Sequence, residues 1–342
     1  MNIKKIKDKN IPQFLLKCIL FFAILFLLDF LGGNFLRYMY FKQIFGELYL
    51  TTYALDSTNA NVLIFGSSTA NHHYKSEIFE KRMNTSVYNV GRDGTNIFYD
   101  YAVLLGVLRR YTPKTILLDF NVSEFQKYQS SYDRLSPLLP YYYTHPEILP
   151  LISLKSTYEK YKFVSKIYPF NSLILSVISR NQNVRKYRKV LDAEKGYVAL
   201  KRHWEGKIEM DTSDGKYELD SNAINTFVSF VQDCHDSNIE LYITVSPRYI
   251  KYKSKDASII LMEKIADKFH LPVYDFLNDS TFLNHNKLFA DRSHLNNTGA
   301  TLFSNKVIDT ILHDTEGSYI KKNKNAISPK MKKKFSYNSF LY

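Results

Sequence analysis

Apolar residues along the chain fall into short runs separated by longer stretches with helical spacing. Residues 62–65 form a continuous apolar run that stops at Gly66, which is typical of a buried strand in a parallel sheet. Further predicted strands are 87–90, 115–120, 241–245 and 273–276, and predicted helices are 70–82, 96–110, 222–237, 257–269 and 297–312. This alternation predicts an α/β domain with a mostly parallel five-stranded sheet.

The stretch of about 125–220, between the third and fourth predicted strands, is rich in Tyr, Lys and Arg. Its pattern indicates helices and loops, and we interpret it as an insertion over the sheet. After Gly317 the chain is rich in Lys and Asn, which predicts a basic, disordered tail over 317–342. The α/β domain with its insertion is therefore expected to span 58–316, with 37–57 as a linker before it.

The N-terminal segment contains the most apolar part of the chain. Residues 14–31 are 18 residues interrupted only by Lys17 and Asp29, near the two ends of the run. Eighteen helical residues span about 27 Å, slightly less than a bilayer core of roughly 30 Å. Charged groups at those positions can reach the membrane interface. We therefore expect residues 1–36 to form a basic stub followed by a transmembrane helix.

Five lysines precede or enter this segment, whereas only Arg37 and Lys42 follow it closely. The positive-inside rule then predicts a cytoplasmic N-terminus, with everything after about residue 35 periplasmic or on the cell surface. A cleaved signal peptide is the alternative, because an 11-residue apolar core also fits one. No small-x-small cleavage site follows the run, which favours an uncleaved single-pass anchor in the cell membrane.

The formal net charge of +13 is concentrated at the two ends of the chain. Residues 1–10 carry a net +3 and residues 317–342 a net +7, which leaves only +3 for the 306 residues between them. The body is nearly balanced, so we expect no nucleic-acid partner, and the tails either contact anionic surfaces or are simply solvated. The two cysteines, Cys18 and Cys234, are poor candidates for a disulfide.

Four segments place chemically competent groups after predicted strands, where reactive groups gather in parallel α/β sheets. Ser68 follows the first strand, Gly94 lies in a Gly-punctuated loop after the second, and Asn121 follows the third. A serine at a strand-to-helix turn suits a nucleophile, and a glycine N–H or an asparagine amide can donate to an oxyanion. Taken singly, Ser68 is better explained as a helix cap and Gly94 as an ordinary turn residue, and Asn121 is equally explained as a turn or cap residue.

The fourth segment is Asp291-Arg292-Ser293-His294. A spacing of three places the carboxylate and the imidazole on one side of a helical turn, where Asp291 could fix the tautomer of His294 and leave its other nitrogen as a base. A surface ion pair is the alternative. His72 and His73 lack a third ligand at suitable spacing, so we expect exposed helix residues there and no metal site. The tyrosines at 141–143 either line a carbohydrate-binding cleft or pack in the core.

Together, in this order and on these elements, the four segments resemble the SGNH (GDSL-like) hydrolase family over roughly residues 58–314. The resemblance implies a three-layer fold, a triad of Ser68, Asp291 and His294, and an oxyanion hole from Ser68, Gly94 and Asn121. Ser67 stands where the family usually has Asp, and Asn121 is not set in the usual Gly-x-Asn-Asp, so Ser67 is a conceivable substitute for Ser68. Both departures resemble the branch that includes the teichoic-acid D-alanylation protein and the alginate O-acetyltransferases, which are membrane-held and act on surface polymers.

The resemblance implies a membrane-anchored, extracytoplasmic serine esterase or O-acyltransferase that works through an acyl-enzyme on acyl esters, such as acetyl esters, of a cell-surface polysaccharide. No metal, nucleotide or other cofactor is required by such a mechanism. One alternative is a non-catalytic carbohydrate-binding or polysaccharide-assembly protein on a hydrolase fold. Another is an acyl carrier station that works only beside an integral-membrane acyl donor.

Overall fold

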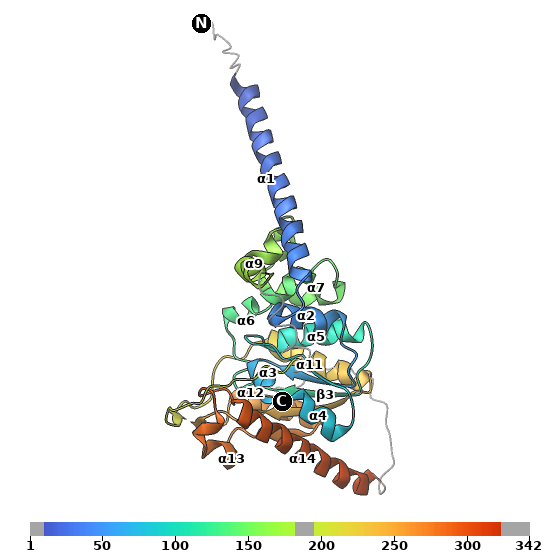
Figure 1. The fold of residues 1–342 in the computed structure, drawn as a ribbon, viewed down its shortest axis with the longest axis vertical. Coiled ribbons are helices and arrows are strands. Elements are labelled where there is room, and N and C mark those ends of the chain that lie inside the picture. The colour runs from blue at the N-terminus through green and yellow to red at the C-terminus, as the bar shows by residue number, and fades with distance from the viewer. Residues whose placement is uncertain (1–9, 182–194, 323–342) are drawn as a thin grey trace.

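The computed structural model describes residues 10–181 and 195–322, with the backbone alone at 10, 179–181 and 314–322. Its centre is a five-stranded sheet in the order β2-β1-β3-β5-β7, in which every neighbouring pair is parallel (Figure 1). The prediction of a mostly parallel five-stranded sheet is therefore confirmed. The strands are β1 (Val62–Gly66), β2 (Val87–Asn89), β3 (Thr115–Asp119), β5 (Glu240–Val245) and β7 (Val273–Asp275).

Helices cover both faces of this sheet, because alternate strand residues point to opposite sides. Leu63, Phe65 and Ile116 belong to one apolar cluster, with α5 (Ile97–Leu108), α11 (Ser221–Asp236) and α12 (Ala257–Lys268). Val62 and Ile64 belong to the other, with α3 (Ser68–His73), α4 (Ser76–Met83), α13 (Ser280–Leu283) and α14 (Asn297–Lys322). Figure 1 shows α5 and α11 on one side of β3 and α14 on the other. The result is three layers, helix–sheet–helix.

The predicted helix at 70–82 is two helices, α3 and α4, separated by an extended Tyr74. The side-chain amide of Asn89, at the end of β2, donates to the carbonyl oxygens of Ala70 at 2.7 Å and Tyr74 at 3.1 Å. These bonds satisfy carbonyl groups that a continuous helix would have used internally. The interruption therefore depends on a long-range contact that local spacing does not reveal.

The N-terminal helix α1 (Asn10–Phe41) is the one helix of the described residues that is long and apolar enough to cross a membrane. It projects away from the body (Figure 1), and its side chains from Ile11 to Leu28 are almost all exposed. This arrangement fits a single-pass membrane anchor. The helix continues ten residues past the apolar run that ends at 31 and five past the anchor segment expected to end at 36, and its last turns pack against the body through Leu36 and Tyr40.

The expected linker at 37–57 is instead part of the packed body. It carries the end of α1 and a second helix, α2 (Gly46–Asp56), which packs against α5. Leu48, Ala54 and Leu55 of α2 are buried. Burial of these apolar side chains accounts for the helix, which had no clear signal of its own in the sequence.

The insertion begins as a series of short helices beside the foot of α1. They are α6 (Gln129–Asp133), η1 (Ser136–Tyr141), η2 (Pro146–Ile148), α7 (Leu149–Ile152), η3 (Ser153–Lys155), α8 (Glu159–Lys162), η4 (Tyr168–Leu173) and α9 (Ile174–Asn181). Both η4 and α9 pack on α1. Tyr141 is fully buried there, with its hydroxyl beside those of Tyr40 and Thr52, so this tyrosine packs in the core.

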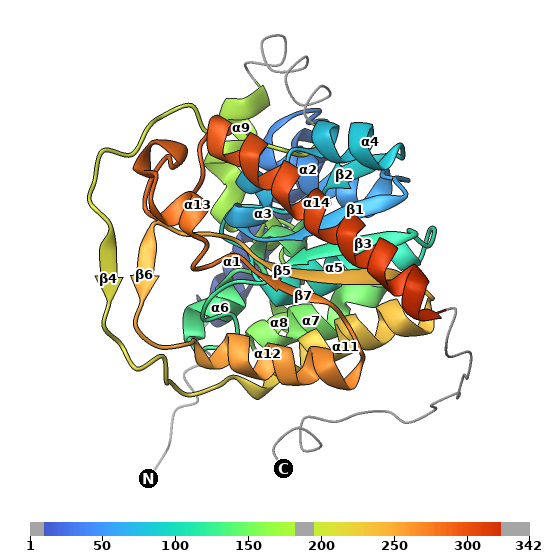
Figure 2. The same cartoon turned by 90° about the horizontal axis from the view of Figure 1, so that it is seen from below.

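From residue 195 the insertion returns along β2 and α3. The N–H of Asn89 donates to Lys195 O at 3.0 Å, and the N–H of Val198 donates to Asn71 O at 3.0 Å. The chain then forms β4 (Glu209–Asp211), which pairs with β6 (Ile250–Tyr252) in a separate two-stranded sheet at the side of the domain (Figure 2). The insertion thus flanks the main sheet and its helices.

The last helix, α14, extends to Lys322, ten residues beyond its predicted end. The first residues of the expected tail, 317–322, are therefore helical, and residues 323–342 lie outside the described part of the chain. Cys18 and Cys234 are both free thiols, and Cys234 is buried in α11.

Candidate active site

Ser68 is the first residue of α3, two residues after β1 ends at Gly66. Gly66 has φ +136°, and a Cβ there would lie 2.7 Å from the Asp119 carbonyl oxygen and 2.9 Å from the Ala70 Cβ. Glycine alone tolerates both the dihedral angle and the close approach. This turn brings Ser68 to the carboxyl end of β1, beside β3, where the strand order of the sheet reverses.

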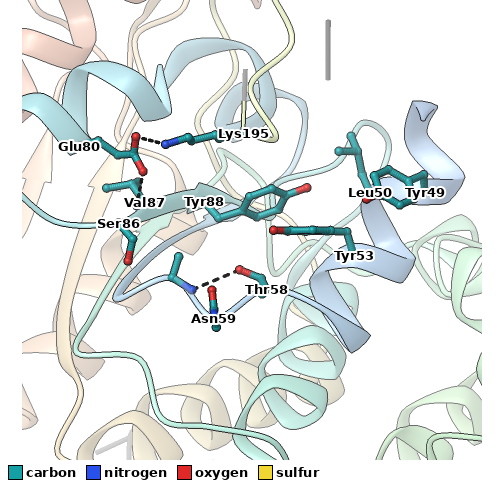
Figure 3. A pocket seen from close by; sticks show the side chains of 11 residues that line it. Tyr49, Leu50, Tyr53, Thr58, Asn59, Glu80, Ser86, Val87, Tyr88 and Lys195 are labelled. Atoms are coloured by element: carbon teal, nitrogen blue, oxygen red, sulfur yellow. Dashed lines mark hydrogen bonds and ion pairs between the residues drawn. The ribbon is translucent and has the colours of Figure 1, made fainter. Parts of the chain in front are cut away.

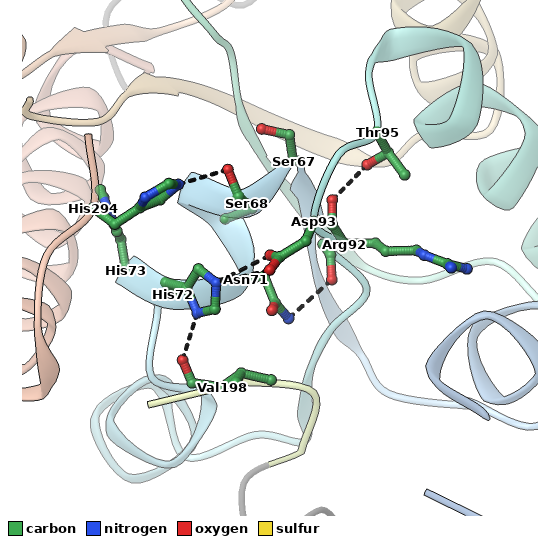
Figure 4. A network of polar contacts seen from close by, with 12 residues as sticks. Ser67, Ser68, Asn71, His72, His73, Arg92, Asp93, Thr95, Val198 and His294 are labelled. Carbon is green, nitrogen blue, oxygen red and sulfur yellow. Dashed lines mark hydrogen bonds and ion pairs between the residues drawn. The ribbon is translucent and has the colours of Figure 1, made fainter. Parts of the chain in front are cut away.

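The side chains of Ser68, His294 and Asp291 form a continuous hydrogen-bonded chain (Figure 4 shows the Ser68–His294 part). Ser68 Oγ lies 2.8 Å from His294 Nε2, and His294 Nδ1 lies 2.9 Å from Asp291 Oδ1. With the imidazole neutral, Nδ1–H donates to the carboxylate and Nε2 accepts the serine hydroxyl hydrogen. The structure therefore brings together three predicted residues that are up to 226 positions apart.

Asp291 and His294 sit in a tight turn that is not helical, which corrects the expected helical turn. The turn is closed by a bridge between Phe289 and Leu295, and Asp291 Oδ1 accepts the N–H groups of Ser293 at 2.9 Å and His294 at 3.0 Å. An aspartate that accepts the amides two and three residues ahead stabilises such a turn without a helix. Asp291 and His294 still lie close together, because the turn folds back so that its N–H groups reach the Asp291 carboxylate.

Several donors stabilise the ionised form of Asp291. Burial alone would raise the pKa of this carboxyl, but hydrogen bonds from the His294 ring, the Ser293 N–H and the Arg202 guanidinium outweigh it. They hold the pKa well below its usual range. Arg202 Nη2 lies 2.6 Å from Asp291 Oδ2. The carboxylate is therefore charged at neutral pH and oriented on both of its oxygens.

Ser68 and His294 open onto a cavity of about 330 Å³ at the carboxyl ends of the strands. Gly94 lines this cavity, has φ +70°, and has no heavy atom within 4 Å of the place where a Cβ would stand. Its backbone is therefore open to a ligand. The other lining residues are mostly polar and include Ser67, Thr95, Asn96, Asn121, Ser123, Glu124, Arg134 and Arg248.

The loop that carries Gly94 is fixed on both sides. Arg92 is buried and donates to the Thr51 hydroxyl on α2, while Asp93 accepts from the His72 ring at 3.1 Å (Figure 4). The Thr95 hydroxyl closes the loop by donating to Arg92 O at 2.7 Å. These contacts hold the Gly94 backbone in the wall of the cavity that Ser68 also lines.

Asn121 also lines the cavity, but its side-chain amide is already engaged in several hydrogen bonds. Asn121 Nδ2 donates to Ser67 Oγ at 2.7 Å, and its Oδ1 accepts from Thr69 at 3.0 Å and Arg248 at 3.1 Å. A primary amide has two N–H groups, so one remains beyond the bond to Ser67. That remaining N–H donates to the Glu124 carboxyl, whose pKa burial raises to about 6, so both amide hydrogens of Asn121 are engaged.

His72 and His73 are buried, contrary to the expectation that they are exposed. The α3 helix that carries them is covered by the returning insertion and by α14, which local periodicity could not show. For His72, burial lowers the pKa, but Asp93 and the Val198 carbonyl raise it by more, so it rises overall. For His73, burial and the nearby His294 ring hold the pKa well below its usual range. His73 therefore stays neutral, with Nε2 accepting the Leu295 N–H at 2.9 Å.

Three arginines at the site were not foreseen from the sequence. Arg202 pairs with Asp291, while Arg134 and Arg248 line the cavity and have no carboxylate partner within ion-pair distance among the described residues. Arg134 and Arg202 come from the insertion, far from any motif. No local signal marks them, because their role depends on how the insertion returns to the domain.

A second cavity, of about 250 Å³, lies at the opposite ends of β1 and β2, between the strands and α2 (Figure 3). Tyr53 and Tyr88 pack against each other in its wall, with ring centroids 4.6 Å apart and ring planes tilted by 36°. Its charged groups are already engaged, because Glu80 pairs with Lys195 and accepts the Val87 N–H at 3.2 Å. It therefore offers no activated nucleophile.

Searches against family models and curated proteins return no match. Among the described residues, no group of three or more His, Cys, Asp and Glu side chains is arranged to hold a metal ion. The geometry of Ser68, His294 and Asp291 is therefore the feature of the molecule that points to a function.

Proposed function

We propose that the chain is a membrane-anchored serine esterase or O-acyltransferase of the SGNH type. The observation that carries this proposal is the hydrogen-bonded series from Ser68 Oγ through the His294 ring to Asp291. A nucleophile, a base and a residue that orients the base define a catalytic triad by geometry rather than by sequence position. The parallel sheet and the order of the motifs along the chain support the SGNH type in particular.

In the first half-reaction, Ser68 Oγ attacks the carbonyl carbon of an ester while His294 Nε2 takes the hydroxyl proton. Asp291 stabilises the imidazolium that forms. The N–H groups of Ser68 and Gly94 would hold the tetrahedral oxyanion, and the Asn121 amide would join them only by giving up its bond to Ser67 or to Glu124. Collapse of the intermediate breaks the ester C–O bond, and the leaving alcohol takes the proton from His294. An acyl group then remains on Ser68.

In the second half-reaction, His294 takes a proton from water or from a sugar hydroxyl, whose oxygen attacks the acyl carbon. The Ser68 oxygen leaves and recovers its proton from His294. Water as the acceptor makes the protein an esterase, and a sugar hydroxyl makes it an acyltransferase. The cavity is open and polar, which suits a hydroxyl-rich acceptor.

The anchor supports an extracytoplasmic location for this chemistry. Five lysines at the N-terminal side of α1 favour a cytoplasmic N-terminus, so the catalytic domain would lie outside. Acyl esters, such as acetyl esters, of a cell-surface polysaccharide are then the substrates within reach. An integral-membrane protein that supplies the acyl group is the partner that transfer would require.

Ser67 is the matched control for the nucleophile. Ser67 Oγ accepts from Asn121, whereas Ser68 Oγ contacts the His294 ring. We expect Ser68→Ala to lower turnover of p-nitrophenyl acetate by about 10⁴-fold or more, since residual rates without a triad serine come from binding and the oxyanion hole alone. Ser67→Ala should retain most of the activity. Loss of activity in Ser67→Ala with retention in Ser68→Ala would assign the nucleophile to Ser67 and overturn the proposal.

A further inference from the structure

The body of the protein first contacts α1 at Asp29. Asp29 Oδ2 accepts the N–H of Lys166 at 2.6 Å, and Oδ1 accepts the N–H of Ile167 at 3.3 Å and the Ser165 hydroxyl. The side chains from Ile11 to Leu28 make no such contact with the body and are exposed, apart from the partly covered Cys18. These eighteen residues span about 27 Å, close to the roughly 30 Å of a bilayer core. If α1 crosses a bilayer, Asp29 therefore marks the level at which the bilayer core ends.

The contact fixes the body firmly at that level. A Cβ on Gly33 would lie only 2.3 Å from the backbone carbonyl carbon of Lys166, so the 165–167 segment packs directly on the backbone of α1. A Cβ on Gly32 would lie 3.2 Å from Ile167 Cδ1. The helix η4, which follows this segment, and α9 also pack on α1. The segments around the foot of α1 therefore lie in the headgroup layer if α1 crosses the bilayer.

The exposed side chains of these segments have the composition of a membrane interface. Tyr158 is 69%, Tyr161 63% and Val164 70% exposed, just before the segment that contacts Asp29. On α9, which lies beside the foot of α1 in Figure 1, Leu175 is 83% exposed. Lysines are interleaved with these residues, at 160, 162 and 166. Tyrosines with apolar rings and polar tips, together with long basic side chains, are enriched at headgroup depth.

A cavity of about 190 Å³ opens in the same place, between α1 and the insertion. Its only charged lining residues are Arg37 and Lys166, and neither has a carboxylate partner within ion-pair distance among the described residues. Lys166 Nζ lies 4.2 Å from the centroid of the Tyr143 ring, which also lines the cavity. The remaining walls include Pro140, Pro169 and Phe170. Two cations above an apolar wall match a phosphate attached to a lipid.

We propose that the face formed by residues 158–167, α9 and the Arg37–Lys166 cavity is a second membrane-contact surface, distinct from the span of α1. It lies in the headgroup layer of an anionic bilayer, and the cavity binds the phosphate of an anionic phospholipid. The inference goes beyond the proposed catalysis and requires only that α1 crosses the membrane. It means that the domain is held at a fixed height and orientation instead of swinging on a tether.

The depth of the surface can be measured on the full chain in nanodiscs that contain anionic lipid. In a Cys18→Ser background, where the remaining Cys234 is buried, a fluorophore is attached at Tyr161→Cys or at Leu302→Cys. Leu302 is exposed on α14, across the sheet from α5 and α11. A nitroxide on the lipid headgroup should strongly quench the label at 161 and leave the label at 302 unquenched. Equal quenching of the labels at the two positions would refute the proposed membrane-contact surface.

Lipid binding by the cavity is tested by charge removal. Arg37→Gln and Lys166→Gln should each reduce the anionic phospholipid that co-purifies with the full chain by about five-fold, the effect of about one cation near a charged membrane. Lys81→Gln, which removes an exposed cation on α4, should leave it unchanged. Unchanged lipid retention in both cavity variants, or displacement of the lipid by inorganic phosphate alone, would contradict the proposal. Resistance of the chain to alkaline extraction from membranes, and ester turnover in the same discs, report the anchor and the catalysis separately.

Discussion

Replacing Asp291 by asparagine is the most informative change to the triad, because it keeps the shape of the side chain and removes its charge. Asp291 Oδ1 receives two backbone N–H groups, which would hold the asparagine oxygen in that position. The new amide nitrogen would then take the place of Asp291 Oδ2, which lies 2.6 Å from Arg202 Nη2 and 3.1 Å from His294 Nδ1. Because an amide nitrogen donates and does not accept, it could not satisfy either of these N–H donors. The His294 tautomer that accepts from Ser68 would no longer be favoured.

The magnitude follows from the charge that is lost. During the reaction the His294 imidazolium lies roughly 4 Å from the carboxylate charge, where an effective dielectric constant of about 20 gives an interaction of about 4 kcal/mol. Because each 1.36 kcal/mol corresponds to a factor of ten, this loss lowers the rate by about 10³-fold. The wrong tautomer adds to it, so we expect a total decrease in kcat of about 10³ to 10⁴-fold.

The assay is hydrolysis of p-nitrophenyl acetate by Asp291→Asn and by the matched variant Arg202→Gln. Arg202 is exposed and bonds only the outer oxygen of Asp291, so its replacement should change kcat by less than about ten-fold. The reasoning is refuted if Asp291→Asn stays within about ten-fold of the wild-type rate. It is refuted equally if Arg202→Gln is as damaging as Asp291→Asn.

Two further predictions concern stability. Gly66→Ala forces a side chain into φ +136° and against the Asp119 carbonyl, so chemical unfolding should show a loss of about 3 kcal/mol; Gly94→Ala, at φ +70° with open space, should lose only about 1 kcal/mol. Equal losses would contradict the assigned role of Gly66. Burial raises the pKa of Glu124 from 4.5 to about 6, so its favourable contribution is complete below pH 4.5 and is lost as the pH rises through 6. Glu124→Gln keeps an acceptor for the Ile97 N–H and does not titrate, so its stability relative to wild type should increase by up to about 2 kcal/mol between pH 4 and pH 7. A difference that stays constant across this range would contradict the raised pKa of Glu124.

The sheet could be predicted from the sequence because its three central strands are short apolar runs buried on both faces. Residues 62–65, 115–120 and 241–245 show this directly, and their predicted boundaries agree with the structure to within one residue. The interruption of the predicted helix at 70–82 and the presence of α2 were harder to predict from the sequence. The side chain of Asn89 in β2 bonds a carbonyl group of α3 where that helix stops, and α2 packs against α5. Both features therefore depend on contacts between segments that are distant in the sequence.

Ser68 could be placed at the carboxyl edge of the sheet because it follows a predicted strand, whereas its pairing with Asp291 and His294 was implied by the resemblance to the SGNH hydrolases. The surroundings of the triad were not predictable in the same way. Arg202 and Val198 reach the site from an insertion that has no periodic pattern of its own. His72 and His73 were misassigned because their burial comes from segments more than a hundred residues away along the chain.

The central claim is that His294 and Asp291 activate the hydroxyl of Ser68. The most direct measurement is treatment of the full chain with a fluorophosphonate, which forms a covalent bond to an activated serine oxygen, followed by peptide mass spectrometry. The account predicts a single adduct on Ser68 that is lost in His294→Ala and retained in Ser67→Ala. No adduct, or an adduct on Ser67 that persists in His294→Ala, would contradict it.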